Sequence, residues 1–359
     1  MVTHVLVVNA GSATLKLALV AENDEIVDSV TLDHWSGEAE TEDIKGFIDG
    51  LPRVDAVGHR IVHGGTEFTG PVRVDDAVRD RIADLAELAP LHQPRGVAGI
   101  DAVHAVLPDT PAIACFDTAF HHHLPPAAAT YALPKEWNER WGLRRYGFHG
   151  LSHAHVARRV AEDVGPGLRI VSCHLGSGAS LAAIHGERSV DTTMGFTPLA
   201  GLVMATRSGD VDPGLVLWLA HHSGIDADEL SDVLEHHSGL AGLTAGSGDL
   251  RDVIEAVDTD PAAQLALDVY LHRLRREIAA MAAAMNGLDV LVFTGGVGEH
   301  QPRVRAAAAA GLSFLGVAIA AKANTAGDRD ITAADARVRT IIVPAREDIE
   351  IARQVRSVH

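Results

Sequence analysis

The sequence has few cysteines, fewer basic than acidic residues and no long apolar run. Cys115 and Cys173 are the only cysteines among 359 residues, too few for a disulfide framework. Each follows or ends an apolar stretch, so we expect buried free thiols in a reducing cytoplasm. The longest weakly apolar run, 306–321, is shorter than the roughly 18 residues of a membrane helix. No basic-then-apolar signal segment opens the chain, and we expect a soluble, intracellular protein.

The shortage of basic residues bears on the partners. Lys and Arg total 30 against 48 Asp and Glu, which gives a formal net charge of −18 at pH 7. A surface of this average sign repels nucleic acid and anionic membranes, so neither is an expected partner. If the substrates are anions, the site must gather positive charge against this background. Arginines within apolar or glycine-rich stretches are therefore the residues to look for.

Length and hydrophobic content favour a large globular fold. The 359 residues exceed the size at which one hydrophobic core keeps growing, so two domains are expected. At 47% hydrophobic and 22% charged residues, the chain has enough apolar material for two cores and no bias toward disorder.

The most informative stretch is Val5–Val20. An apolar, β-branched run breaks at a small polar segment and then resumes, which is the pattern of a β-hairpin. The same arrangement returns at Ile170–Ile184, with Gly176 in the place of Gly11. Two copies of one hairpin suggest a duplicated fold.

A third glycine stretch, Gly295–Gly298, follows the apolar run Val290–Phe293. Glycines let the backbone approach a phosphate closely, and exposed N–H groups with Ser or Thr hydroxyls then supply donors. Any one of these loops alone is more simply an ordinary tight turn. Three of them after strand-like runs in one chain favour a nucleotide-phosphate site.

Two arginines stand where a charge is costly. Arg60 lies inside the apolar stretch Val54–Val62, so something anionic should meet it, and a structural salt bridge competes about evenly with a ligand. Arg207 is flanked by small residues, with Asp210 and Asp212 nearby. An Asp–Arg staple of this loop is the weaker alternative, because Arg60 raises the same question independently.

Other candidate residues follow strand-like runs or glycines. Asp117 follows the run Pro111–Phe116, and a carboxylate at the carboxyl end of a strand lies where ligands bind in α/β sheets. The histidines at 121–123 suggest a metal, but three consecutive side chains cannot all face one ion, so a solvated run is expected. His149 lies on a glycine-bearing loop that enters a helix and is placed to meet a ligand, although most lone histidines are structural.

Periodicity and capping signals predict the remaining elements. Strands are expected over 25–32, 54–62, 111–116, 311–319 and 338–343. Helices are expected over 75–89, 96–106, 261–285 and 302–310, over two parts of 215–240, and from a Ser152 cap to about 164. A loop is expected over 322–329. A last helix starts near Pro344, where its dipole explains Asp348 and leaves Glu347 free for other work.

Ten segments carry a family pattern in the family's order: NAGSATLK, GHRIVHGG, APLHQP, FDTAFHHHLP, RYGFHGLSH, HLGSGAS, DTTMGFTPLAGLVMATRSGDVDP, SGDLRD, FTGGVGE and PAREDIEIA. In them the chain resembles the acetate kinases over essentially its whole length. The resemblance implies an α/β actin-like ATPase fold, with two duplicated βββαβαβα domains around a central nucleotide cleft. The N-terminal domain would comprise 1–118 and 346–359, and the C-terminal, nucleotide-binding domain 119–345.

The resemblance also implies roles for single positions. Arg60 and Arg207 would contact the transferring phosphoryl group and the acetate carboxylate. His149 would stabilise the transition state together with Arg207, with His92 in a lesser catalytic role. Asp117 and Glu347 match acids that orient or coordinate magnesium, and Asn9 is expected beside the metal. The residues implied for the acetate pocket, besides Arg60, are Val62, Leu91, Phe148 and Pro198.

The nucleotide site implied by the resemblance is spread over four segments. Its residues are Ser12, Lys16, His174, Leu175, Gly176, Ser177, Gly178, Asp249, Leu250, Arg251, Gly295, Gly296, Val297 and Gly298. Ser177, Leu250 and Arg346 depart from the family's usual residues, so the preferred phosphoryl donor stays open.

The implied reaction is Mg²⁺-dependent, with Mn²⁺ also possible, and reversible: acetate attacks the γ-phosphate of ATP in line, giving acetyl phosphate and ADP. The acetate carboxylate is ionised at pH 7, so no general base is required. Alternatives are a kinase of a longer acid such as propionate, another donor such as pyrophosphate, a phosphohistidine route through His149, and a nucleotide-switched ATPase without an acceptor. The apolar residues beside Arg60 and His149 argue against the nucleotide-switched ATPase, because such a protein needs no pocket for a methyl group. A homodimer is expected from the resemblance only.

Overall fold

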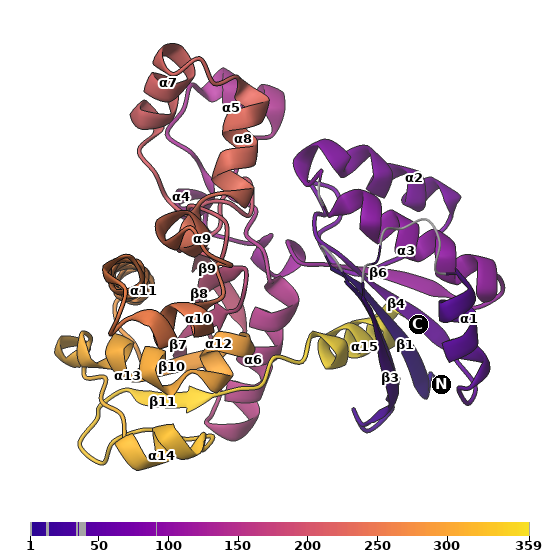
Figure 1. The fold of residues 1–359 in the computed structure, drawn as a ribbon. Coiled ribbons are helices and arrows are strands. Elements are labelled where there is room, and N and C mark those ends of the chain that lie inside the picture. Colours follow the sequence, from indigo (N-terminus) through magenta and orange to yellow (C-terminus); the bar gives the residue numbers. More distant parts are fainter. Residues whose placement is uncertain (1, 12–13, 34, 36–40, 91, 359) are drawn as a thin grey trace. The chain divides into compact units, whose positions relative to one another are not determined.

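The computed structural model describes residues 2–11, 14–33, 35, 41–90 and 92–358, and its chain divides into two compact units (Figure 1). Unit 1 comprises residues 1–122, 148–155 and 346–359, and unit 2 comprises 123–147 and 156–345. The domain limits expected from the sequence stay a prediction. They differ from the units in two segments, 119–122 and 148–155, which lie in unit 1.

Unit 1 is built on a mixed sheet with the strand order β3-β2-β1-β4-β6-β5. Its strands are β1 (His4–Ala10), β2 (Thr14–Ala21), β3 (Ile26–Asp33), β4 (Ala56–Ile61), β5 (Val72–Arg73) and β6 (Ala112–Phe116). β1 and β2 form the expected hairpin. β1, β4 and β6 run parallel, so their carboxyl ends meet at one end of the sheet.

Helices cover both faces of this sheet. They are α1 (Thr41–Asp49), α2 (Asp76–Asp84), α3 (Gln93–Val106) and α15 (Glu347–Val358), with the 3-10 helices η1 (Leu85–Leu88) and η2 (Ala119–His121). Successive residues of β1 point to opposite faces, so Leu6 packs in one cluster with Val103 of α3, and Val7 packs in another with Val355 of α15. A Cβ at Gly58 of β4 would lie only 2.5 Å from Ile351 of α15. Sheet and helix are therefore in close contact.

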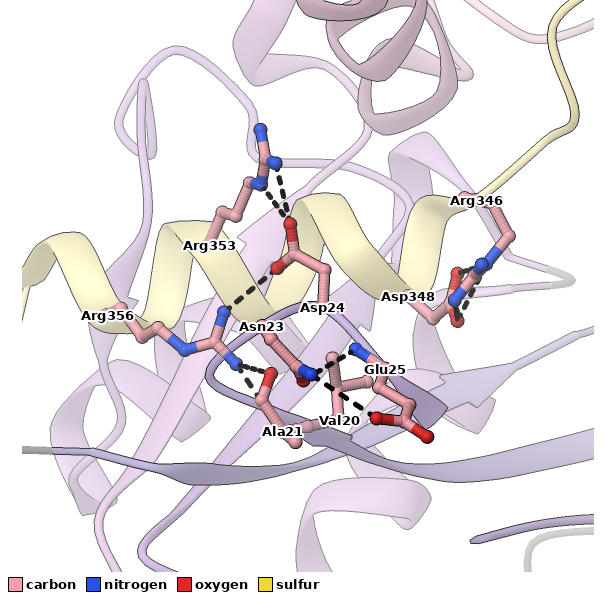
Figure 2. A network of polar contacts seen from close by, with 9 residues as sticks. All are labelled: Val20, Ala21, Asn23, Asp24, Glu25, Arg346, Asp348, Arg353 and Arg356. Atoms are coloured by element: carbon pink, nitrogen blue, oxygen red, sulfur yellow. Dashed lines mark hydrogen bonds and ion pairs between the residues drawn. The ribbon is translucent and has the colours of Figure 1, made fainter. Parts of the chain in front are cut away.

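The helix α15 is also fastened to the β2–β3 turn (Figure 2). Asp24 in this turn has a φ of 64°, a left-handed conformation that Asp tolerates better than most residues. Its carboxylate accepts hydrogen bonds from Arg353 at 2.6 and 2.9 Å and from Arg356 at 3.2 Å. The C-terminal helix thus completes unit 1 by polar as well as apolar contacts.

Unit 2 repeats the strand arrangement of unit 1. Its sheet has the order β11-β10-β7-β8-β9, formed by β7 (Arg169–Leu175), β8 (Ala179–His185), β9 (Arg188–Thr192), β10 (Val290–Thr294) and β11 (Arg339–Ile342). β7, β8 and β9 pair antiparallel, whereas β7, β10 and β11 run parallel. In unit 1, likewise, β1, β2 and β3 pair antiparallel and β1, β4 and β6 run parallel. The duplication expected from the two hairpins is confirmed.

Most of the helices belong to unit 2. They are α4 (Pro126–Ala129), α5 (Lys135–Trp141), α7 (Pro213–His222), α8 (Ala227–His236), α9 (Gly239–Thr244), α10 (Leu250–Ala256), α11 (Pro261–Ala284), α12 (Gly295–His300), α13 (Pro302–Ala310), α14 (Ala321–Ala326) and the 3-10 helix η3 (Ser313–Leu315). The helix α6 (Gly150–Asp163) begins in unit 1 and ends in unit 2. In the described part of the chain, none of the helices is long and apolar enough to cross a membrane.

Several local predictions are wrong. Gly295–Gly298 is not a loop but most of the short helix α12. The apolar segment 311–319 is not a strand: it contains η3, a left-handed Gly316 with a φ of 90°, and isolated bridges at Val317 and Ile319. The segment 322–329 is not a loop, because α14 extends into it up to Ala326.

The α6 region departs from the expectation because of contacts between distant segments. α6 begins at Gly150, so Ser152 lies inside the helix and is not its cap. The histidine run is not solvated throughout: His121 is fully buried, and its Nε2 is hydrogen-bonded to the carbonyl of Phe148 at 3.1 Å. Cys115 and Cys173 are buried free thiols, as expected.

Candidate functional site

Three predicted residues of unit 1 meet at the carboxyl ends of parallel strands. We call Asn9 of β1, Arg60 of β4 and Asp117 after β6 the strand-end cluster. Nη2 of Arg60 lies 2.6 Å from a carboxylate oxygen of Asp117, and its Nε lies 3.2 Å from both oxygens. Nη1 of Arg60 donates to Oδ1 of Asn9 at 3.0 Å. The guanidinium is therefore held on two sides.

The strand-end cluster is largely removed from water. The side chain of Asp117 is 2% exposed and that of Arg60 is 18% exposed. Burial alone would lower the pKa of Arg60, but the charge and hydrogen bonds of Asp117, with the charge of Glu347, raise it above its usual value. Of the two alternatives for Arg60, the salt bridge is thus present. It leaves part of the guanidinium accessible to a ligand.

His149 lies in a strained loop of the same unit. Its φ of 54° is left-handed, a conformation that costs energy in a residue with a Cβ. The next residue, Gly150, donates its backbone N–H to the carbonyl of Asp117 at 2.9 Å. A Cβ at Gly150 would overlap that carbonyl, so only glycine fits. The start of α6 thereby fixes the backbone of the half-buried His149 relative to Asp117.

Glu347 and Asp348 open α15 in different environments. Asp348 pairs with Arg346 at 2.9 Å (Figure 2). Glu347 is half-buried, and its side chain forms no ion pair or hydrogen bond with the residues that the structure describes. Its charge nevertheless contributes to raising the pKa of Arg60. Glu347 therefore keeps a carboxylate available on the side of unit 1 that carries Arg60.

For the other residues predicted in unit 1, the structure gives at most a position in the fold. Lys16 is exposed on β2, opposite Asn9 in the hairpin register. His92 is half-buried and directly precedes α3, without a capping bond from its side chain. Ser12 and Leu91 lie outside the described residues.

The residues predicted for the apolar pocket do not all belong to one unit. Val62 and Phe148 belong to unit 1 and are 7% and 1% exposed. The ring of Phe148 packs edge-on against His63, with the ring centroids 5.5 Å apart. Pro198 belongs to unit 2.

In unit 2 the predicted catalytic residue is Arg207. It donates to the carbonyl of Pro198 at 2.7 Å, and within the described ranges it has no carboxylate partner. Burial lowers its pKa, and the charge of Glu235 offsets only part of that effect. The Asp–Arg staple is not formed among these residues: Asp210 accepts a backbone N–H and pairs with Arg276, and Asp212 accepts a backbone N–H. A partly buried cation is left with unused donors.

Unit 2 also contains a cavity of about 470 Å³. We call it the unit 2 cavity. Predicted nucleotide residues from the three later segments line it: Gly176, Ser177, Asp249, Leu250, Arg251, Gly296 and Val297. Asp249 caps α10 and pairs with Arg251, which lowers the pKa of Asp249. The structure thus brings together three stretches that lie far apart in the sequence.

The remaining nucleotide residues of unit 2 are not in the cavity lining. They are His174, Leu175, Gly178, Gly295 and Gly298. Leu175 is fully buried, and Gly295, with a φ of 77°, would place a Cβ 2.7 Å from the Leu175 carbonyl. The backbone of Leu175 therefore lies close to the turn from β10 into α12 at Gly295. A Cβ at Gly296 would meet only open space.

Sequence reasoning missed part of the cavity lining. Ala205, Leu240, Tyr270, His300 and Gln301 also line it. His300 and Gln301 directly follow the glycine stretch and could have been included with it. Tyr270 gave no signal, because its place in the long helix α11 is that of a core residue.

The chain matches a known protein family over most of its length. The acetokinase family profile matches residues 39–353. The chain is similar to the acetate kinase of Shouchella clausii, with 41% identity over 385 residues that cover 97% of this chain and 98% of that protein. It is 40% identical to the acetate kinase of Bacillus subtilis, with 98% of both chains covered.

Solved structures show the same relationship. A propionate kinase from Francisella tularensis has a TM-score of 0.92 at 32% identity, with 98% of both chains covered. An acetate kinase from Porphyromonas gingivalis has a TM-score of 0.89 at 34% identity, with 99% of both chains covered.

Proposed function

The chain belongs to the acetokinase family and has its actin-like ATPase fold, and we propose that it carries out this family's reaction through Arg60, Asp117, His149 and Arg207. The enzyme is a phosphotransferase with a carboxyl group as acceptor: it transfers the γ-phosphoryl group of ATP to acetate, giving acetyl phosphate and ADP. The reaction is reversible.

The unit 2 cavity is the observation that carries the proposal. Its 470 Å³ and its lining by glycine-bearing stretches suit a nucleotide, because backbone N–H groups and the Ser177 hydroxyl can face phosphates there. We assign ATP and ADP to this cavity. Gly176, Ser177, Gly296 and Val297 would approach the phosphates, and Asp249, Leu250 and Arg251 would lie against the adenosine. Lys16, Ser12, His174 and Gly178 are proposed to assist on the phosphate side.

Arg207 is the proposed stabiliser of the transferring phosphoryl group. Phosphoryl transfer needs charge neutralisation on the equatorial oxygens more than covalent chemistry from the protein. A guanidinium already drawn from water, with no carboxylate partner among the described residues, is suited to bind such an anion. The phosphate would be the bonded anionic partner that Arg207 lacks among the described residues.

Arg60 is the proposed anchor of the acetate carboxylate. Asp117 and Asn9 fix its guanidinium, so a substrate meets a cation whose orientation has already been set. His149 would assist Arg207 in the transition state, with His92 in a lesser role. Val62, Phe148, Pro198 and Leu91 are the proposed contacts of the acetate methyl group.

The proposed path is direct in-line attack. Acetate is ionised at neutral pH, so its oxygen attacks without a general base. The phosphorus–oxygen bond to ADP breaks as the bond to acetate forms, which inverts the configuration at phosphorus. A route through phosphorylated His149 would involve two displacements and retain it. Chiral ATP distinguishes the two.

We extend the proposal to magnesium, with Mn²⁺ as a substitute. Mg²⁺ prefers oxygen ligands and is usually held by one or two carboxylates together with substrate phosphates. Glu347 has a carboxylate not engaged by the described residues, whereas Oδ1 of Asn9 and the carboxylate of Asp117 already accept hydrogen bonds from Arg60. Glu347 and Asn9 would be the protein ligands of Mg²⁺, with the nucleotide phosphates supplying the other oxygens. Bound to the nucleotide, the ion would neutralise phosphate charge.

The proposed assembly is a cytoplasmic homodimer with no nucleic-acid or membrane partner. Leu215, Leu217 and Trp218 of α7 are 48%, 62% and 55% exposed. A helix with this apolar surface is a candidate for contact with a second copy. Sedimentation of the full chain tests the dimer.

One assay tests the reaction and its substrate. Purified protein is incubated with ATP, Mg²⁺ and acetate, propionate or butyrate, and the acyl phosphate is trapped with hydroxylamine. We expect acetyl hydroxamate to form fastest, and parallel reactions with GTP and pyrophosphate define the donor. ATP hydrolysis without a trapped product from any acid would contradict the proposal.

Propionate is the second candidate acceptor, because a propionate kinase is among the similar solved structures. One methylene in an apolar pocket changes binding by only about 1–3 kcal/mol, so both acids can react at different rates.

A further inference from the structure

Arg207 depends on one segment of unit 2 for its orientation. Its guanidinium donates to the carbonyl of Pro198, and within the described chain that is the one hydrogen bond its side chain makes. Pro198 ends the segment 192–198, which begins with the last residue of β9. Whatever fixes this segment therefore also fixes the guanidinium.

Tyr131, which follows α4, contacts the segment near its centre. Its hydroxyl oxygen accepts the backbone N–H of Phe196 at 2.8 Å. Gly195 packs so closely on the hydroxyl that a Cβ there would overlap it. The backbone of Tyr131 is fixed by Asn138, whose side chain donates a hydrogen bond to the Tyr131 carbonyl at 2.9 Å. The hydroxyl is thus a fixed point against which residues 195 and 196 rest.

Arg145 fixes the beginning of the same segment. Its Nη1 donates to the carbonyls of Thr192, Thr193 and Met194 at 3.0, 3.1 and 3.1 Å. Between Met194 and Pro198, Tyr131 supplies a side-chain hydrogen bond to the backbone at Phe196, while the N–H groups of Tyr146 and Gly147 donate to the Gly195 carbonyl at 3.0 and 3.3 Å. The Thr197 hydroxyl adds only a long bond, at 3.4 Å, to the N–H of Leu199.

We propose that Tyr131 is a positioning residue for Arg207, acting through the backbone of Phe196–Pro198. This inference rests on the proposed role of Arg207 in phosphoryl transfer. Without the hydroxyl, the Phe196 N–H loses its acceptor and the Pro198 carbonyl can shift away from the guanidinium. The unit 2 cavity has a different lining, so the effect falls on turnover and not on nucleotide binding.

A double-mutant cycle tests the proposal. Tyr131→Phe is made in the wild type and in Arg207→Ala, and kcat, the KM for ATP, ADP affinity and Tm are measured for each. In the wild type we expect kcat to fall about tenfold, since small misplacements of a charge have effects of this order, with KM and ADP affinity unchanged. In Arg207→Ala the same change should have no further effect on kcat.

Two further variants sharpen the cycle. Gly195→Ala displaces the hydroxyl while keeping Tyr131, and it should show the same coupling to Arg207. Tyr146→Phe is the matched control, because it removes a hydroxyl that donates to the Gly142 carbonyl at 3.1 Å and keeps the ring contact with Phe196 and the backbone bond to Gly195. It should leave kcat unchanged.

The outcomes separate the two claims. A tenfold loss of kcat in both backgrounds, or a loss of ADP affinity together with kcat, would overturn the positioning role, as would no loss in Tyr131→Phe. Near-normal activity of Arg207→Ala would instead remove the proposed role of Arg207 itself.

Discussion

The two arginines that the sequence singled out lie in opposite electrostatic situations. Arg60 in unit 1 is paired with Asp117 at 2.6 Å, and its pKa is raised. Arg207 in unit 2 has one backbone carbonyl and no carboxylate among the described residues, and burial lowers its pKa. An internal carboxylate fixes a cation and reduces its attraction for other anions. Arg60 is thus suited to orient the acetate carboxylate. Arg207 is suited to attract the negative charge of the phosphoryl group.

The strongest test of this contrast is Arg207→Ala. We expect kcat to fall by about 10²–10³, the usual cost of removing one preorganised charge stabiliser. Arg207→Lys is the control, since it keeps the charge but cannot present the guanidinium's paired donors. Hydroxamate formation measures the rate. Activity within a few fold of the wild type would remove the distinction between the arginines.

Asp117→Asn tests the paired arginine. The amide keeps the shape of the carboxylate but loses its charge, so Arg60 is no longer firmly oriented, and we expect kcat to fall about 10²-fold. Asp101→Asn is the matched control, because Asp101 pairs with Arg79 at an exposed position. Equal losses in the two variants would mean that the strand-end pair has no special role.

Unit 1 also contains a buried histidine, His59, next to Arg60 in β4. We expect it to make the stability of the protein depend on pH. Burial lowers the pKa of His59 to about 3. Since an unfolded histidine titrates near 6.5, the unfolded chain binds one more proton between these values, and stability falls as the pH drops below about 6.5. At pH 5 this amounts to about 2 kcal/mol.

Urea unfolding at pH 7.5 and pH 5 measures this effect. His59→Gln should lose about 2 kcal/mol less than the wild type between the two pH values. The control is His104→Gln, at an exposed position on α3. Parallel losses in the wild type and His59→Gln would show that the buried imidazole is not the acid-sensitive group of unit 1.

A pair of glycines gives the smallest expected effect and tests unit 2 alone. In Gly296→Ala the methyl group enters open space at the cavity, so we expect the KM for ATP to rise about tenfold, roughly 1.4 kcal/mol of binding, with Tm unchanged. Gly295→Ala should instead lower stability by about 1–2 kcal/mol, because the left-handed backbone disfavours a Cβ. Nucleotide titration and thermal melting separate the two. Identical behaviour would contradict our assignment of the cavity.

Features set by local sequence were predictable. The hairpins follow from apolar, β-branched runs broken by small polar residues, and Arg60 stood out because a guanidinium inside an apolar strand needs an anion. Asp117 was found from its position after β6. Its pairing with Arg60 was one of two open alternatives, because strand register and spatial neighbours are not written in any single segment.

What could not be predicted depends on contacts between distant segments. α6 begins at Gly150 and not at a Ser152 cap, because Gly150 packs on the Asp117 carbonyl. His121 is buried and bonded to the Phe148 carbonyl, a contact that a run of three histidines does not reveal. The apolar segment 311–319 fails to form a strand because Gly316 turns the backbone.

The dependence of unit 1 on α15 has a consequence for synthesis on the ribosome. Residues 4–116, which form its sheet, emerge early, but the helix that packs on Val7 and Gly58 and binds Asp24 emerges only after all of 156–345. While the later half of the chain is synthesised and folds, one apolar face of the nascent sheet lacks the helix that covers it. A nonsense codon shortly before residue 347 would therefore damage the part of the protein that the ribosome made first.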